Sequence, residues 1–292
     1  MVPPPRVVVR PRPSEWLLAT YALVIIATGL FRVDRYPAAI WAVVAHVLLI
    51  GLLGLFQWPR LGSSGRVMRD AAPFVLLLAL YGALDLLSGF GAEPTYDRLI
   101  RGWERGLFGQ EISREWWQRA PSPLWSSVLH TAYFAYYFAI PVPILLAMAR
   151  RDERRLVPAS FALMTTFVLC YLGFLFFPVA GPYYEYPRPA GWFTANLAAK
   201  AVYGVLAEGS SYGAAFPSSH VAATWVAAAV TWPASRWWGA ALVVAAALLT
   251  VGVVYCQMHY GVDAVAGLAV AAAVVPATWW ASATSSRSAP NS

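Results

Sequence analysis

The chain has 292 residues, of which 59% are hydrophobic and only 12% are charged. An ordinary soluble domain carries roughly 25% charged residues, so this composition excludes a typical soluble protein and favours a polytopic membrane protein. The net charge of +7 comes from basic residues that are dispersed between apolar segments and form no basic face, which argues against a nucleic-acid partner.

Apolar segments of about 20 residues recur along the chain, and this length spans a bilayer core of roughly 30 Å. In chain order they are Trp16–Phe31, Ala38–Trp58, Ala71–Gly89, Leu124–Ala149, Leu156–Pro178, Ser218–Trp232, Trp238–Met258 and Val262–Ala281. No small-residue cleavage site follows the first, so we expect a retained anchor rather than a signal peptide. The pattern predicts an all-α, polytopic bundle of about eight transmembrane helices.

The basic residues predict how these helices are oriented. Cytoplasmic loops collect Arg and Lys, and the densest basic cluster lies at residues 150–155. An even number of spans then places both termini in the cytoplasm of a multi-pass protein of the plasma (inner) membrane. The loops at residues 90–122 and 179–217 are expected on the outer face.

The two outer loops differ in character. Tyr96–Gln118 mixes acidic and basic residues with Ile100, Trp103 and Leu107 at helical spacing, which predicts an interfacial helix on the outer leaflet. Such a helix would either gate the entry of a lipid or seal the bundle. The second loop holds Pro187-Arg188-Pro189, which forbids a continuous helix there.

Two short polar segments interrupt the apolar sequence near the C-terminus. The first is Phe216-Pro217-Ser218-Ser219-His220. Pro217 suits the first turn of a helix, so Ser218, Ser219 and His220 would lie at a helix N-terminus. Free backbone N–H groups at such a terminus bind anions, and a phosphate is the natural occupant.

The second polar segment is His259-Tyr260-Gly261-Val262-Asp263. The chain crosses the membrane twice between His220 and His259, so both histidines are expected on the outer side. His259 and Asp263 are four residues apart, and in a helix they would share a face. A carboxylate bonded to one imidazole nitrogen leaves the other as a nucleophile or base.

These residues together indicate phosphoryl transfer through a phosphohistidine, although three alternatives stay open. The histidines could be ordinary interfacial residues. Two histidines and an aspartate could also bind a metal, but no carboxylate cluster accompanies them, so we expect neither metal nor cofactor. A lipid or small-molecule transporter would use buried charges too, although such proteins commonly show internal repeats, which are not evident here.

The motifs Phe-Pro-Ser-Ser-His and His-x-x-x-Asp resemble the second and third signatures of the type 2 phosphatidic acid phosphatase superfamily. The resemblance implies a six-helix core, here residues 71–292, preceded by two additional transmembrane helices in residues 1–70. It also implies that His259 is the nucleophile, that Asp263 orients it, and that His220 protonates the leaving group. Ser218 would bind phosphate, and no metal would be needed.

The chain departs from the phosphatase branch of that superfamily at several motif positions. Ser219 replaces a glycine, Gly252-Val253 replaces Ser-Arg, and Gly181 stands in place of the first motif's lysine, although Arg188-Pro189 is present. In lacking this arginine before His-Tyr-x-x-Asp, the chain is more similar to the branch that contains sphingomyelin synthase and inositol phosphorylceramide synthase.

The sequence therefore predicts a metal-independent enzyme acting on a lipid-linked phosphate at the outer membrane face. Transfer of a phosphoryl headgroup to an alcohol or polyol is favoured over hydrolysis of a polyprenyl phosphate or phosphatidic acid. The expected phosphate-binding residues are Ser218, Ser219, Arg188 and Lys200, and the further expected substrate contacts are Asp85 and Tyr183. Donor, acceptor and oligomeric state are left open.

Overall fold

The computed structural model describes residues 11–58 and 62–287, and in this part of the chain the regular structure is helical throughout. The all-α prediction is thus confirmed. Contacts divide the chain into two units, Met1–Gly89 and Phe90–Ser292. This division does not by itself test the boundary expected after residue 70, which stays a prediction.

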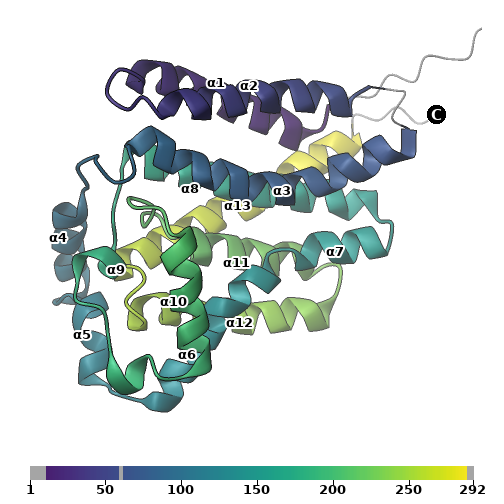
Figure 1. The fold of residues 1–292 in the computed structure, drawn as a ribbon. Coiled ribbons are helices and arrows are strands. Elements are labelled where there is room, and N and C mark those ends of the chain that lie inside the picture. The colour runs from purple at the N-terminus through teal and green to yellow at the C-terminus, as the bar shows by residue number, and fades with distance from the viewer. Residues whose placement is uncertain (1–10, 59–61, 288–292) are drawn as a thin grey trace, which may run out of the picture. The chain divides into compact units, whose positions relative to one another are not determined.

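The N-terminal unit consists of α1 (Pro13–Arg32), α2 (Ala39–Phe56) and α3 (Gly62–Ser88). Figure 1 shows α1 and α2 as a helical hairpin. A buried ion pair of 2.6 Å between Glu15 and Arg69 joins α1 to α3. Because each buried charge has its opposite beside it, the cost of removing the two from water is reduced.

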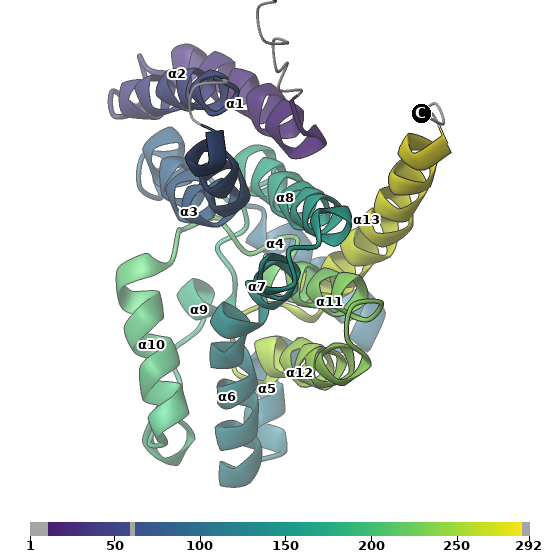
Figure 2. The ribbon, with the colours of Figure 1, turned by 90° about the vertical axis from the view of Figure 1, so that its right-hand side faces the viewer.

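The second unit contains the polar segments. Its helices are α4 (Asp97–Phe108), α5 (Ile112–Arg119), α6 (Pro123–Ala139), α7 (Val142–Ala149), α8 (Glu153–Phe176), α9 (Pro182–Glu185), α10 (Leu197–Gly209), α11 (Ser219–Thr231), α12 (Arg236–Tyr255) and α13 (Gly261–Arg287). A short 3₁₀ helix, Gly191–Phe193, precedes α10. Figure 1 shows α4, α5 and α9 at one end of the long helices, and Figure 2 looks along α8, α11 and α12.

Six helices among the described residues are long and apolar enough to cross a membrane. They are α1, α2, the continuous segment Pro123–Ala149 formed by α6 and α7, α8, α12, and α13 as far as Trp279. The protein is therefore a multi-pass membrane protein. The other two expected spans correspond to α3, whose described apolar part is Ala79–Ser88, and to α11, which has only 13 residues.

The outer loop at residues 90–122 differs from the single interfacial helix expected for Tyr96–Gln118. It forms two helices, α4 and α5, because the chain turns at Gly109. The backbone φ of Gly109 is 73°, in the left-handed region that glycine adopts without a steric penalty. The expected amphipathic pattern is present in α4, but Gly109 ends that helix, so the chain does not form the expected single helix.

The chain reverses tightly between α12 and α13. After α12 ends at Tyr255, the N–H groups of Met258 and His259 both donate to the carbonyl of Val253, at 2.9 Å each. These bonds fold residues 256–259 back over the last turn of α12. The result is that His259 is held close to the C-terminal end of α12.

Candidate functional site

The structure brings the two predicted histidines together. His220 lies in the first turn of α11, and His259 lies in the turn before α13. The Nε2 atom of His259 is 3.4 Å from the Nδ1 atom of His220, and the ring centroids are 5.5 Å apart. His259 is only 3% exposed. Both imidazoles can therefore act on one bound group.

His259 is oriented by two acceptors on its other nitrogen. Its Nδ1 atom is 3.0 Å from the backbone carbonyl of Ala215 and 3.4 Å from Oδ2 of Asp263. Since a carbonyl and a carboxylate can only accept, the proton belongs on Nδ1. The lone pair of Nε2 then lies on the side of His220 and is available for nucleophilic attack.

Asp263 has a second bond that the helical spacing did not predict. Its Oδ2 atom accepts from the N–H of Tyr260 at 2.8 Å, which caps the start of α13. His259 precedes the helix, so the spacing of four residues does not set its contact with Asp263 as it would inside a helix. Asp263 is fully buried, and its Oδ1 atom has no partner among the described residues.

The start of α11 differs slightly from the prediction. The helix begins at Ser219 with Ser218 as its N-cap, so Pro217 precedes the cap instead of lying in the first turn. The hydroxyl of Ser218 accepts from Val221 N at 3.4 Å. Within the described residues, no bond occupies the N–H groups of Ser219 and His220. They can bind an anion beside the histidines.

Two tyrosines of α6 cover His220, and the sequence did not single them out. The His220 ring stacks on Tyr133 at 4.7 Å between centroids and lies 4.4 Å from Tyr136. They belong to the aromatic run at residues 133–138, and from the sequence alone this run is expected to pack in the membrane core. Their spacing of three residues puts them on one helix face, and this was the only available signal.

The remaining predicted residues lie in different places. Arg188 is exposed, and its guanidinium carbon is 4.4 Å from the ring centroid of Tyr183. Tyr183 is buried, and its hydroxyl finds no partner in the part of the chain that is described. Lys200 is exposed on α10. Asp85 is half-buried on α3 in the other unit, so its role stays a prediction.

Packing fills the two positions where the phosphatase signatures carry a cation. A Cβ atom on Gly181 would lie 2.8 Å from Cβ of Ala215, closer than real side chains approach. Val253, at the arginine position, is fully buried in the hydrophobic core beside the site. In both places the chain uses the space for contacts and leaves none for a long basic side chain.

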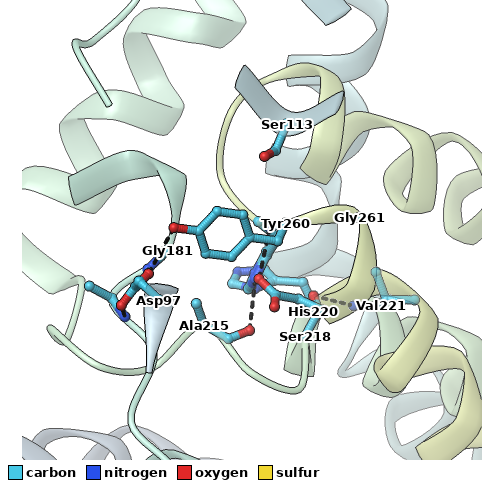
Figure 3. A network of polar contacts seen from close by, with 12 residues as sticks. Asp97, Ser113, Gly181, Ala215, Ser218, His220, Val221, Tyr260 and Gly261 are labelled. Carbon is cyan, nitrogen blue, oxygen red and sulfur yellow. Dashed lines mark hydrogen bonds and ion pairs between the residues drawn. The ribbon is translucent and has the colours of Figure 1, made fainter. Parts of the chain in front are cut away.

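A buried polar network surrounds the turn that carries His259, as Figure 3 shows. The hydroxyl of Tyr260 donates to Asp97 on α4 at 2.9 Å, and the N–H of Gly261 donates to Glu104 at 2.8 Å. Sequence reasoning placed both acids on an interfacial helix and assigned them no partner. Across residues 11–58 and 62–287, no three His, Cys, Asp or Glu residues gather as a metal site would require.

Comparison with known proteins gives one match. A family model described as the PAP2 superfamily matches residues 98–277, which is more than half of the 292 residues. The matched range includes both polar segments. No curated protein and no solved structure matches the chain significantly.

Proposed function

The chain belongs to the PAP2 superfamily, whose members are phosphatases and phosphotransferases, and on that premise we propose that His259 attacks a lipid-linked phosphoester. The observation that carries the proposal is the arrangement of the two histidines. Nε2 of His259 faces Nδ1 of His220 at 3.4 Å, while its own Nδ1 is held by Ala215 and Asp263. This is the arrangement of an oriented nucleophile beside a proton donor.

The proposed reaction has two steps. In the first, Nε2 of His259 forms a bond to phosphorus, the bond from phosphorus to the lipid oxygen breaks, and His220 gives its proton to that oxygen. In the second, an acceptor hydroxyl attacks phosphorus, its proton passes to His220, and the bond between nitrogen and phosphorus breaks. The free N–H groups of Ser219 and His220 bind the phosphoryl oxygens throughout.

The charges of the site support transfer of a phosphoryl headgroup over hydrolysis of a monoester. A phosphomonoester carries nearly two negative charges near neutral pH, and a diester carries one. With Gly181 and Val253 at the two cation positions, a singly charged diester suits the site better. Attack at the diester releases the lipid alcohol and leaves the headgroup phosphate on His259 for an alcohol or polyol acceptor.

Arg188 and Tyr183 are the proposed contacts for the headgroup. The Tyr183 hydroxyl is buried with no hydrogen-bond partner among the described residues. A ligand that supplies a hydrogen-bond partner to this hydroxyl would remove the cost of leaving it unsatisfied, and binding would be more favourable. The guanidinium of Arg188 lies over the same ring and brings a positive charge. Ser218 caps α11, and Lys200 is proposed as a more distant attraction for phosphate.

The proposed location of the site is the outer face of the plasma membrane, with both termini in the cytoplasm. The basic cluster at residues 150–155 extends into the first turn of α8, and the loop at residues 177–181 follows this helix. Most of the 24-residue helix therefore separates the cluster from the loop beside the site. The positive-inside rule supports an inner position for the cluster.

A product assay tests the function. The purified protein is incubated with lipid phosphomonoesters and phosphodiesters, with and without inositol, glycerol or a sugar, and released phosphate and product mass are followed. We expect headgroup transfer from a diester, and phosphate release without an acceptor would instead identify a phosphatase. His259→Ala should lose about 10⁴-fold or more in rate, whereas His46→Gln, at a buried histidine of α2, should remain active. Full activity of His259→Ala would contradict the proposal.

A further inference from the structure

Asp97 is a buried acid of α4 for which the proposed reaction has no direct use. Its side chain is 3% exposed, and no cation pairs with it in the described part of the chain. A buried carboxylate without a cation is costly unless hydrogen bonds satisfy it. Hydrogen-bond donors around Asp97 must therefore stabilise its carboxylate.

The donors to Asp97 come from two distant parts of the chain. Oδ2 accepts from Ala180 N at 2.8 Å, and Oδ1 accepts from Gly181 N at 2.8 Å and from the Tyr260 hydroxyl at 2.9 Å. In Figure 3 the side chain of Tyr260 points away from the turn toward Asp97 and Gly181. One carboxylate thus links the loop before α9 to the turn that carries His259.

The loop before α9 reaches His259 by a second route. Ala215 N donates to the carbonyl of Val179 at 2.9 Å, and the carbonyl of Ala215 accepts from Nδ1 of His259 at 3.0 Å. Together with the covalent chain, these hydrogen bonds form a closed circuit. It runs from Asp97 through residues 179–181, Ala215, His259 and Tyr260 and back to Asp97. Two supports of the His259 ring, its own turn and the Ala215 carbonyl, are thus linked to the Asp97 carboxylate, while Asp263 is a third support.

We propose that Asp97 is a positioning residue for the nucleophile, acting through Tyr260 and the 179–181 loop. This inference rests on the proposed function, because it assumes that His259 attacks phosphorus. It assigns α4 a part in setting the attack geometry, in addition to covering the bundle. A displacement of about 1 Å at a reacting group costs up to about 10²-fold in rate, so a small loss of alignment is measurable.

Tyr260→Phe tests the proposal because it removes one bond of the circuit and leaves the backbone bonds of Asp97 in place. We expect the rate of phosphohistidine formation in a single turnover, counted per active site, to fall about tenfold. The KM and the thermal midpoint in detergent should stay close to the wild-type values. Asp97→Asn should have a larger effect, because both Asp97 oxygens accept from N–H groups and an amide nitrogen cannot.

Tyr186→Phe is the matched control. Tyr186 is equally a buried tyrosine of the same hydrophobic cluster, and its hydroxyl donates to a carboxylate, that of Glu111, at 2.9 Å. This variant should form phosphohistidine at the wild-type rate. If Tyr260→Phe matches the control while His259→Ala is inactive, Asp97 has no positioning role and the proposed function stands. If His259→Ala is active, the proposed function itself is wrong. Should Asp97→Asn fail to fold, Tyr260→Phe still decides.

Discussion

The first turns of α11 and α13 lie side by side, but their backbone N–H groups are used in opposite ways. At α11, the Ser218 hydroxyl caps only Val221, through a bond of 3.4 Å, and the N–H groups of Ser219 and His220 are unoccupied in the described residues. At α13, carboxylates accept from the N–H groups of the residue before the helix and of its first residue. Asp263 accepts from Tyr260 N, and Glu104 accepts from Gly261 N, both at 2.8 Å.

Under the proposed function, this difference gives each helix start one task. The free N–H groups of α11 can bind the phosphate, because the partial positive charge of the terminus is not neutralised. Two carboxylates at α13 would repel an anion, but they fix the turn and thereby His259. An enzyme with few cations at its site can thus still separate phosphate binding from the positioning of the nucleophile.

Among the tests of this difference between the two helix starts, the largest effect is expected from Asp263→Asn, which changes the charge at the start of α13. Asparagine still offers an oxygen to Tyr260 N, so the cap persists. The negative charge 3.4 Å from Nδ1 of His259 is lost, and with it the stabilisation of the ring during attack. We expect phosphohistidine formation to slow by about 10² to 10⁴-fold. Asp152→Asn, at an exposed ion pair, is the control, and an unaltered rate in Asp263→Asn would show that Ala215 alone orients His259.

Gly267→Ala tests whether the two helix starts must lie this close. An added Cβ would be 2.6 Å from the carbonyl oxygen of Ser218, so α13 would have to move away from α11. We expect a lower thermal midpoint and a rate about ten- to a hundredfold below wild type. Gly204→Ala in α10, where a Cβ meets nothing within 4 Å, should leave both unchanged. Equal behaviour of the two variants would mean that the spacing is not critical.

Ser219→Pro removes one free N–H from α11 at a position that accepts proline. Ser219 is the first helical residue, and Ser218 already has the extended conformation required before proline, with ψ 105°. We expect the inhibition constant for vanadate to rise about tenfold, as for the loss of one charge-assisted hydrogen bond. Ser219→Ala keeps the N–H and should bind vanadate nearly as wild type. If Ser219→Pro bound vanadate as tightly as wild type, the phosphate would not bind at the N–H of Ser219.

The smallest effect concerns the pH dependence of stability. Burial raises the pKa of Glu104, although bonds from Gly261 and Ser113 oppose the shift. A carboxyl with a raised pKa in the folded state keeps its proton where the unfolded chain has lost it, so this contribution to stability falls as pH rises above the unfolded pKa of about 4.3. The thermal midpoint of wild type should fall by a few degrees relative to Glu104→Gln as pH rises from there toward neutrality. If the thermal midpoints of wild type and Glu104→Gln changed with pH in parallel, the raised pKa of Glu104 would be contradicted.

The sequence predicted the pairing of His220 with His259 because it follows from local patterns. The apolar length between them predicts that the chain runs away from His220 and returns to His259, and each histidine adjoins a helix start. The capping of α13 by Asp263 could also have been read from the position of this acid in the first turn.

The partners of Asp97 and Glu104 could not be predicted in this way. Apart from the hydroxyls of Tyr260 and Ser113, their donors are backbone N–H groups, at residues 113, 180, 181 and 261, and every residue type except proline has such a group. No side-chain pattern therefore marks them. The contacts of Tyr133 and Tyr136 with His220 could not be predicted for a related reason. In the sequence, a tyrosine that covers a histidine ring looks the same as a tyrosine that packs in a membrane core.

The length of α11 has a consequence for where the proposed reaction takes place. α11 and α12 leave the same turn at residues 232–235, and at 1.5 Å per residue their 13 and 20 residues extend about 20 Å and about 30 Å. α11 is thus about 10 Å shorter than α12 and shorter than the roughly 30 Å hydrocarbon core. In the proposed orientation, with this turn at the inner face, the phosphate site at the start of α11 would lie deeper than the outer end of α12. Turnover should then depend on the thickness of the bilayer in which the protein is reconstituted.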